Sequence, residues 1–186
     1  MRALRRLTTA CLMTSLMIGA SSASLSAQER IENEQVVIYS QRWLVSKDPS
    51  QNGLMSYLTV QRGKAGEYFS VTCRREGSHV LRGLRLGFPE EQPSFVREGA
   101  KFARVEISVD GRVQPLDIKY TGTTADQAFG RDSIYGYEVI FPSVAARDGF
   151  IDGLRTGSHM KISGQSLPVE LKGSSLALQG QEDYCK

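Results

Sequence analysis

The sequence predicts a mainly β domain, an antiparallel β-sandwich or partly closed barrel, with one helix near the end and a short C-terminal helix. Three observations support this fold class. Segments rich in β-branched and aromatic residues recur from residue 35 to residue 141, with turn residues between them. One Asp-Gly pair joins two alternating segments in the manner of a β-hairpin. After Ser143 the apolar period becomes helical.

The expected strands of the first half alternate with short turn clusters. QVVIYSQRWLVS predicts one strand or two short ones around Trp43, KDPSQNG a turn, and LMSYLTVQR and EYFSVTCRR further strands. In the last of these, Phe69, Val71 and Cys73 share one face, so we expect Cys73 to point into the core. EGSH then turns the chain into the strand VLRGLRLGF.

The strongest hairpin signal lies in FARVEISVDGRVQPLDIKY. Asp110-Gly111 is the favoured two-residue turn of such a hairpin. Pairing outward from this turn sets Val105 opposite Leu116 and Ala103 opposite Ile118. These pairs give one continuous apolar face, which indicates that one side of the hairpin is buried.

Two features of the middle of the chain predict irregularity. Pro115 has no N–H to donate to a ladder, so we expect its strand to lie at a sheet edge. TGTTADQAFGRDS, residues 121–133, is the longest polar stretch and is expected to be a mobile loop. IYGYEVIF then returns to strand.

The segment after Ser143 is expected to form a helix. Ser143 can cap its start and Gly157 can end it. Apolar residues recur between them at helical spacing, at Ala146, Phe150, Ile151 and Leu154. HMKISG and LPVELKG follow as expected short strands. Ser174 or Ser175 can then cap a terminal helix that leads to Cys185.

Residues 1–27 have the three-part plan of a secretory signal peptide. A basic head with three arginines precedes an apolar stretch over residues 7–20 and then small residues, with cleavage after Ala23 or Ala27. Ala27 is favoured because a polar segment follows it. The apolar stretch is too short to span a bilayer, which takes about 20 residues. We therefore expect residues 28–186 to form a single β-rich domain that is periplasmic or secreted and has no transmembrane segment.

The net charge of the expected mature chain is zero. The full sequence has 23 Lys and Arg against 20 Asp and Glu, and the leader contains three of the arginines, which leaves 20 of each sign. The basicity of the full chain is thus a targeting feature. It gives no support for nucleic-acid binding, which we do not expect.

Cys73 and Cys185 are the two cysteines of the expected mature chain. An even pair in an exported protein is expected to form a disulfide. Such a bond would attach the terminal helix to the body of the domain, where a chain end would otherwise fray. The alternative is two free thiols, one of them reactive. Neither cysteine has a nearby histidine in sequence or a Cys-x-x-Cys pattern to support it.

Catalytic and metal-binding motifs are absent from the sequence. His79 and His159 lack further ligands at metal-binding spacings. Gly173–Ser175 lacks the second glycine of a nucleophile elbow. The acidic pairs Glu90-Glu91 and Glu182-Asp183 are expected to be solvated surface. We therefore expect a protein that is not an enzyme and that holds no metal or cofactor.

Four arginines form the candidate binding feature of the sequence. Arg74, Arg75, Arg82 and Arg85 flank a single expected hairpin. A guanidinium binds carboxylate and phosphate in a forked geometry, so lipopolysaccharide, an acidic glycan or a partner protein could be the ligand. The alternative is that these are solvent-facing strand residues paired with local acids such as Glu67 and Glu76.

The C-terminal part carries a family resemblance. GFIDGLRTGSHMKIS places a helix before a Gly-x-x-hydrophobic strand, and LPVELKGSSLALQGQEDYC contains a Leu-x-Gly-x-x-x-Ala-hydrophobic segment. This pattern resembles small periplasmic proteins of the invasion-associated locus B kind from alphaproteobacteria, which also have a signal peptide and an early tryptophan. Ser174 stands where that family usually has phenylalanine. The matching positions are Trp43, Gly157, Met160, Leu171, Gly173, Ala177 and Leu178.

The resemblance implies a β-rich envelope protein linked to host association or envelope fitness, without catalytic residues to transfer. Two functional hypotheses follow from the sequence as a whole. The first is a noncatalytic periplasmic binding or interaction protein of the bacterial envelope. The second is an inhibitor or accessory factor of an envelope enzyme or secretion machine, for which the loop at 121–133 would be the inserted element.

Overall fold

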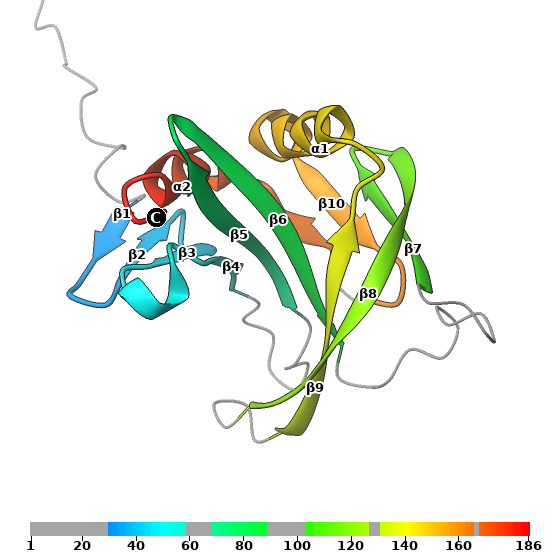
Figure 1. Cartoon of the computed structure of the whole chain (residues 1–186), viewed down its shortest axis with the longest axis horizontal. Coiled ribbons are helices and arrows are strands. Elements are labelled where there is room, and N and C mark those ends of the chain that lie inside the picture. The colour runs from blue at the N-terminus through cyan, green and yellow to red at the C-terminus, as the bar shows by residue number, and fades with distance from the viewer. Residues whose placement is uncertain (1–29, 59–67, 89–102, 127–130, 166–167) are drawn as a thin grey trace, which may run out of the picture.

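The computed structural model describes residues 30–58, 68–88, 103–126, 131–165 and 168–186 (Figure 1). Within these ranges the chain forms eleven strands, two α-helices and one short 3-10 helix. The expected signal peptide lies outside the described residues. Among the helices of the described part, none is long and apolar enough to cross a membrane.

All eleven strands belong to one antiparallel sheet. Its order is β1-β2-β3-β4-β5-β6-β9-β8-β7-β10-β11. The first six strands follow the chain order, whereas β9, β8 and β7 run in reverse order before β10 and β11 complete the sheet. The strands are β1 (Arg30–Glu32), β2 (Val36–Tyr39), β3 (Trp43–Ser46), β4 (Met55–Tyr57), β5 (Tyr68–Glu76), β6 (His79–Phe88), β7 (Ala103–Val109), β8 (Arg112–Asp126), β9 (Arg131–Ile140), β10 (His159–Ile162) and β11 (Val169–Glu170).

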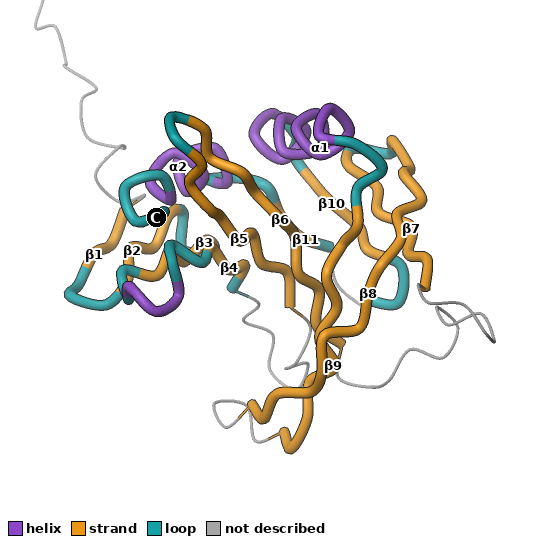
Figure 2. The backbone as a smooth tube through the Cα atoms, in the orientation of Figure 1, coloured by secondary structure: helices purple, strands orange, loops and turns teal. Residues whose placement is uncertain are grey.

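The sheet curves so that its last strand, β11, lies near β4, and it does not close (Figure 2). On β11, the Glu170 N–H donates to the Tyr57 hydroxyl of β4 over 3.1 Å. The Glu170 carboxylate also lies 2.8 Å from the Arg42 guanidinium, just before β3. One hydrophobic cluster, including Trp43 and Met160, fills the enclosed side. The predicted mainly β, antiparallel fold is confirmed, and it takes the form of a single open, curved sheet.

Both predicted helices are present and lie in the upper half of Figure 1. The first, α1 (Val144–Thr156), starts where Ser143 accepts a hydrogen bond from the Ala146 N–H, as the sequence predicts. It ends at Gly157. The second, α2 (Ser174–Gln181), packs against β2, β3 and β4 and against α1. The apolar stripe of α1 buries Phe150, Ile151 and Leu154.

The predicted serine cap of α2 is wrong. Gly173 occupies the N-cap position with φ +86°, a left-handed conformation that glycine adopts without strain. A side chain at this position would also overlap Ser40. Ser174 is fully buried, and its hydroxyl donates to the Leu154 carbonyl of α1. The serine therefore joins the two helices instead of capping one of them.

The β7–β8 hairpin has the predicted register. Val105 pairs with Leu116 and Ala103 with Ile118, around a turn at Asp110 with φ +46°. The Asp110 carboxylate accepts hydrogen bonds from the backbone N–H groups of residues 159 and 158, which hold the pKa of this carboxyl below its usual value. The turn thus fixes the start of β10 beside the hairpin.

The predicted mobile loop at 121–133 is wrong for most of its length. β8 continues to Asp126 and β9 begins at Arg131, while residues 127–130 lie outside the described residues. Thr121, Thr123 and Thr124 favour strand at its start, and two register shifts accommodate its irregularities. The expectation for Pro115 also fails, because β8 lies between β9 and β7. Pro115 is tolerated because β9 pairs with β8 only from Asp117 onward.

Replacing Gly180 with alanine is expected to destabilise the fold. A Cβ at this buried position of α2 would overlap the Tyr39 hydroxyl and ring. Overpacking of this kind costs about 1–3 kcal/mol. Gly149→Ala is the matched control, since it lies in α1 and its added methyl meets open space, so it should stabilise by up to about 1 kcal/mol. Denaturant unfolding of both variants measures the difference, and equal unfolding free energies would contradict this packing of α2.

Candidate functional site

The β5–β6 hairpin presents its four arginines to two different faces of the sheet. Arg82 is the register partner of Cys73, and both lie on the inner face, which carries the core. Arg75, two residues beyond Cys73, shares this face. Arg74 and Arg85 lie on the opposite, outer face. The structure therefore does not gather the four residues into one patch.

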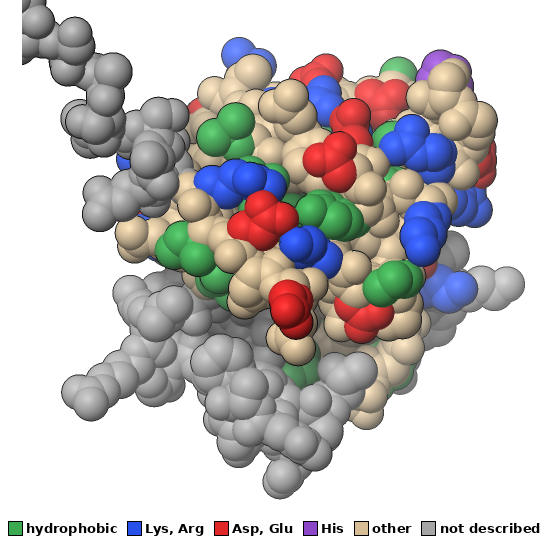
Figure 3. All heavy atoms as spheres, turned by 90° about the vertical axis from the view of Figure 1, so that its left-hand side faces the viewer, with side chains coloured by type: hydrophobic (Ala, Val, Ile, Leu, Met, Phe, Trp, Pro, Cys, Tyr) green, Lys and Arg blue, Asp and Glu red, His purple; other side chains and the backbone are tan. Residues whose placement is uncertain are grey.

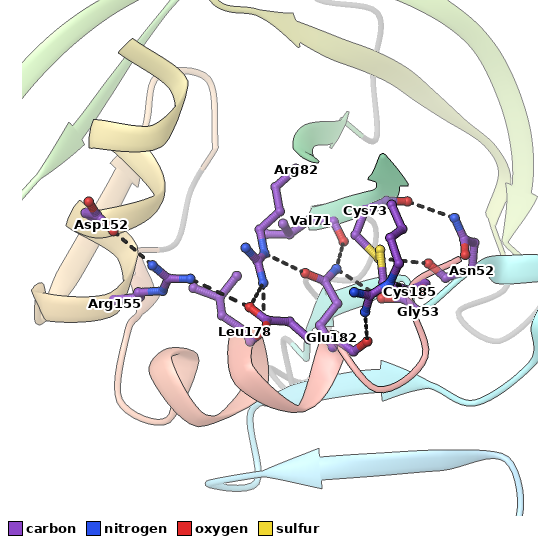
Figure 4. Close-up of polar contacts among 12 residues, drawn as sticks. Asn52, Gly53, Val71, Cys73, Arg82, Asp152, Arg155, Leu178, Glu182 and Cys185 are labelled. Carbon is purple, nitrogen blue, oxygen red and sulfur yellow. Dashed lines mark hydrogen bonds and ion pairs between the residues drawn. A yellow bond between two sulfur atoms is a disulfide. The ribbon is translucent and has the colours of Figure 1, made fainter. Parts of the chain in front are cut away.

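Arg82 is buried and contacts α2 (Figure 4). Its Nε donates to Gln181 Oε1 over 3.1 Å. Its terminal nitrogen Nη2 donates to the Leu178 carbonyl over 3.0 Å and to Glu182 Oε1 over 2.7 Å. Only 8% of the side chain is exposed, so Arg82 is not available as the surface anion-binding residue that the sequence suggested. Its guanidinium instead holds the C-terminal helix on the sheet.

Gln181 extends the same network to two further backbone segments. Its side chain is fully buried, and Nε2 donates to the carbonyls of Gly53 over 3.0 Å and Val71 over 2.8 Å. Its Oε1 accepts from Arg82. One side chain thus satisfies a carbonyl before β4, a carbonyl of β5 and a buried guanidinium, as buried polar groups require.

The predicted disulfide between Cys73 and Cys185 is present, with the two Cα atoms 5.8 Å apart. It joins residues 112 positions apart in sequence. For a loop of about 100 residues the chain-entropy model assigns roughly 4.7 kcal/mol of stabilisation. The bond attaches the segment after α2 to β5, and both cysteines are buried.

Arg75 completes this group from the same face of β5. Its Nε donates to the Cys185 carbonyl over 3.3 Å and its Nη2 to the Glu182 carbonyl over 2.8 Å. Arg74, on the outer face, pairs with Glu76, as the sequence alternative proposed. We call the inner-face group the C-terminal clasp, and its members are Cys73, Arg75, Arg82, Gln181, Glu182 and Cys185.

A groove of about 510 Å³ crosses the outer face over β4, β5, β6, β9 and β8. Strand register places polar side chains in one row across these strands, in the order Ser56, Ser70, Arg85, Glu138 and Lys119. Ser56, Ser70 and Arg85 line one end of the groove, whereas Glu138 and Lys119 do not line it. Thr121, Thr123 and Ile134 line the other end. We call this feature the outer-face groove.

The floor of the outer-face groove consists partly of glycine. Gly87 pairs with Gly136, and Gly136 pairs with Gly122 after a register shift. All three line the groove. Because glycine has no side chain, the backbone of this row reaches the groove at the half-buried Gly122 and Gly136, while Gly87 is buried. Sequence reasoning missed the groove because its glycines are distant in sequence. Gly122 lies 35 residues after Gly87 and 14 residues before Gly136, and the three become neighbours only through the strand order β6-β9-β8.

Arg85 is the cation of the outer-face groove. Its side chain is exposed, and no hydrogen bond or ion pair joins it to any residue in the described part of the chain. Its nearest charged neighbours by register are Glu138 and then Lys119. The row therefore carries one net positive charge, which an anionic group can approach.

The remaining sequence candidates do not converge on a site. His79 and His159 are exposed at the starts of β6 and β10. In the described ranges, no group of three His, Cys, Asp or Glu side chains could hold a metal ion. Glu90-Glu91 lies outside the described residues. Glu182 belongs to the clasp, and Asp183 is exposed.

Charges on the face seen in Figure 3 are mixed. Basic and acidic side chains are interspersed there, without a large area of one sign. Ion pairs in the described part of the chain include Lys47 with Glu32 and Arg155 with Asp152. Such surface pairs contribute little to stability and leave no field of one sign to attract a polyanion.

No family model matches the chain, and neither curated proteins nor solved structures gave a match. The resemblance to the invasion-associated locus B proteins stays a prediction from the C-terminal sequence pattern. Three of its matching positions have clear structural roles. Gly173 is the left-handed cap of α2, Ala177 and Leu178 are fully buried on that helix, and the pattern therefore describes how α2 packs.

Replacing Arg82 with methionine is expected to destabilise the protein by about 1–3 kcal/mol, because Gln181 Oε1 loses its donor in a buried site. Arg74→Met is the matched control. It removes an arginine from the same hairpin, but one that is 69% exposed, and should change the unfolding free energy by no more than about 0.5 kcal/mol. Urea unfolding measures both values. Equal effects would show that the buried network adds nothing.

Proposed function

We propose that the protein is a noncatalytic, exported binding protein of the bacterial envelope, whose ligand is an anionic envelope component held in the outer-face groove. The observation that carries this proposal is Arg85, an exposed guanidinium that lines a 510 Å³ groove and has no partner among the described residues. A guanidinium in that setting is suited to a carboxylate or phosphate.

Export is supported by two independent features. The leader has the composition of a signal peptide, with a basic head, an apolar stretch and small residues. The Cys73–Cys185 disulfide forms and persists in oxidising compartments such as the periplasm. The resemblance of the C-terminal segment to periplasmic invasion-associated locus B proteins points to the same compartment. The same resemblance implies that the protein takes part in host association or envelope fitness.

The alternative is an inhibitor or accessory factor of an envelope enzyme or secretion machine. The observation that favours it is the β8–β9 hairpin, whose far end projects beyond the rest of the sheet at the bottom of Figure 1. A projecting hairpin is suited to insertion into a partner protein. This hypothesis replaces the predicted loop at 121–133 with a strand pair as the inserted element.

Cosedimentation of the purified mature protein with isolated bacterial envelope fragments tests the proposal. Arg85→Ala should weaken binding at least tenfold, because hydrogen bonds to a charged group contribute about 1.5–3 kcal/mol and about 1.4 kcal/mol corresponds to a factor of ten. The matched control is Arg104→Ala. Arg104 is also exposed on a strand of this sheet, but it pairs with Asp117 and does not line the groove.

Binding of Arg85→Ala at the wild-type level would contradict the proposal. Loss of binding in both arginine variants would indicate a diffuse charge effect without a specific site. The inhibitor or accessory factor would be favoured by a different result. One dominant envelope protein would be captured, its capture would not depend on Arg85, and shortening the β8–β9 tip would abolish it.

A further inference from the structure

We infer that the ligand of the outer-face groove is a saccharide that carries a carboxylate, such as a uronic acid; this inference rests on the proposed function. The groove combines four features that together fit such a ligand. These are hydroxyl side chains, a glycine floor, a single free guanidinium, and apolar side chains at two separate points.

Hydroxyl groups stand at both ends of the groove. Ser56 and Ser70 lie on β4 and β5, with their Oγ atoms 3.3 Å apart. Thr121 and Thr123 line the groove from β8. Each hydroxyl can donate one hydrogen bond and accept others, as the hydroxyls of a sugar ring also do. A sugar placed between the two ends can therefore exchange hydrogen bonds in either direction.

The glycine floor leaves room for a sugar ring. Gly87, Gly136 and Gly122 are neighbours across three strands. Gly136 and Gly122 are half-buried and present only backbone to the groove, whereas Gly87 is buried. A Cβ added at Gly136 would lie 3.0 Å from the Thr121 hydroxyl and would narrow the space. Leu54 and Ile134 line the groove on either side of this floor. Leu54 is half-buried and can contact the C–H groups of a ring, whereas Ile134 is buried and supports the lining.

The charges of the groove favour a monoanion such as a carboxylate over a phosphate monoester. Arg85 provides a forked donor that matches both anions. Glu138 lies directly opposite Arg85 on β9, so its carboxylate opposes any anion bound there. A phosphate monoester near pH 7 carries about −1.5 to −2 charges and meets more repulsion than a carboxylate with one. The single net positive charge of the row thus suits a monoanion.

Two other ligand classes fit the groove less well. An extended peptide commonly binds by adding a strand to a free sheet edge. At the groove, Ser70 of β5, Arg85 of β6 and Gly136 of β9 are paired with strands on both sides, so no free edge is offered there. A lipid chain needs a continuous apolar lining. Here serine, threonine and arginine side chains also line the groove, and a lipid chain would leave these polar groups without hydrogen-bond partners.

Titration calorimetry of the purified protein with oligogalacturonate tests this inference. Oligogalacturonate should bind at least tenfold more tightly than a neutral maltooligosaccharide of equal length. Arg85→Ala should lose at least tenfold in affinity, and Arg85→Lys should recover part of it. Glu138→Gln should bind as tightly as the wild type or more tightly. Arg104→Ala should bind as the wild type does, and denaturant unfolding checks that each variant is folded.

Equal affinity for the acidic and neutral oligosaccharides, or no effect of Arg85→Ala, would overturn the inference. Arg85-dependent binding to phosphatidylglycerol vesicles without oligogalacturonate binding would also overturn it, but would leave the proposed function intact. If no probe and no envelope fragment binds in an Arg85-dependent way, the inference and the proposed function both fail.

Discussion

The fold depends on the buried contact between Arg82 and the C-terminal helix. A guanidinium inside a protein is costly unless its donors are paired, and this one gives hydrogen bonds to the side chain of Gln181, the backbone of Leu178 and the carboxylate of Glu182. Because Gln181 also binds Gly53 and Val71, α2 can satisfy all of these groups in only one position. The clasp therefore specifies how the end of the chain docks, and the disulfide between Cys73 and Cys185 makes that docking covalent.

The docking of α2 affects the whole curved sheet. The helix covers the inner face of β2, β3 and β4, and it contacts α1, which in turn reaches β6. The sheet itself does not close, and its last strand, β11, contacts β4 and the segment before β3 through Glu170, which bonds Tyr57 and Arg42. Hydrophobic burial then fills the enclosed space with Trp43, Phe69 and their neighbours. The inner face is thus committed to stability, while the outer face contains the groove proposed as the binding site.

Local patterns predicted much of this structure. Alternation and the Asp110-Gly111 turn gave the β7–β8 register, and Ser143 gave the start of α1, because each depends on residues close in sequence. The disulfide followed from the cysteine count and the leader. The segment after Tyr120 was misread because its polar residues resemble a loop, whereas pairing with β9 across two register shifts makes it a strand.

The binding features required the tertiary structure. Alternation alone places Arg74 and Arg75 on opposite faces of β5, yet the sequence cannot show that α2 buries Arg82 or that Arg85 faces a groove. The glycine floor forms only when β6, β9 and β8 become neighbours out of sequence order. Long-range strand order therefore separates the structural arginines from the one that is available to a ligand.

Native-state hydrogen exchange of α2 tests most directly whether the clasp joins the C-terminus to the core. If the clasp works as described, the amides of α2 open only with the strands that it contacts. In the oxidised protein they should then be as strongly protected as those of β5 and β6. Fast exchange of α2 beside protected strands would contradict the account, because the helix would then open alone and the buried Arg82–Gln181 contact would not hold it.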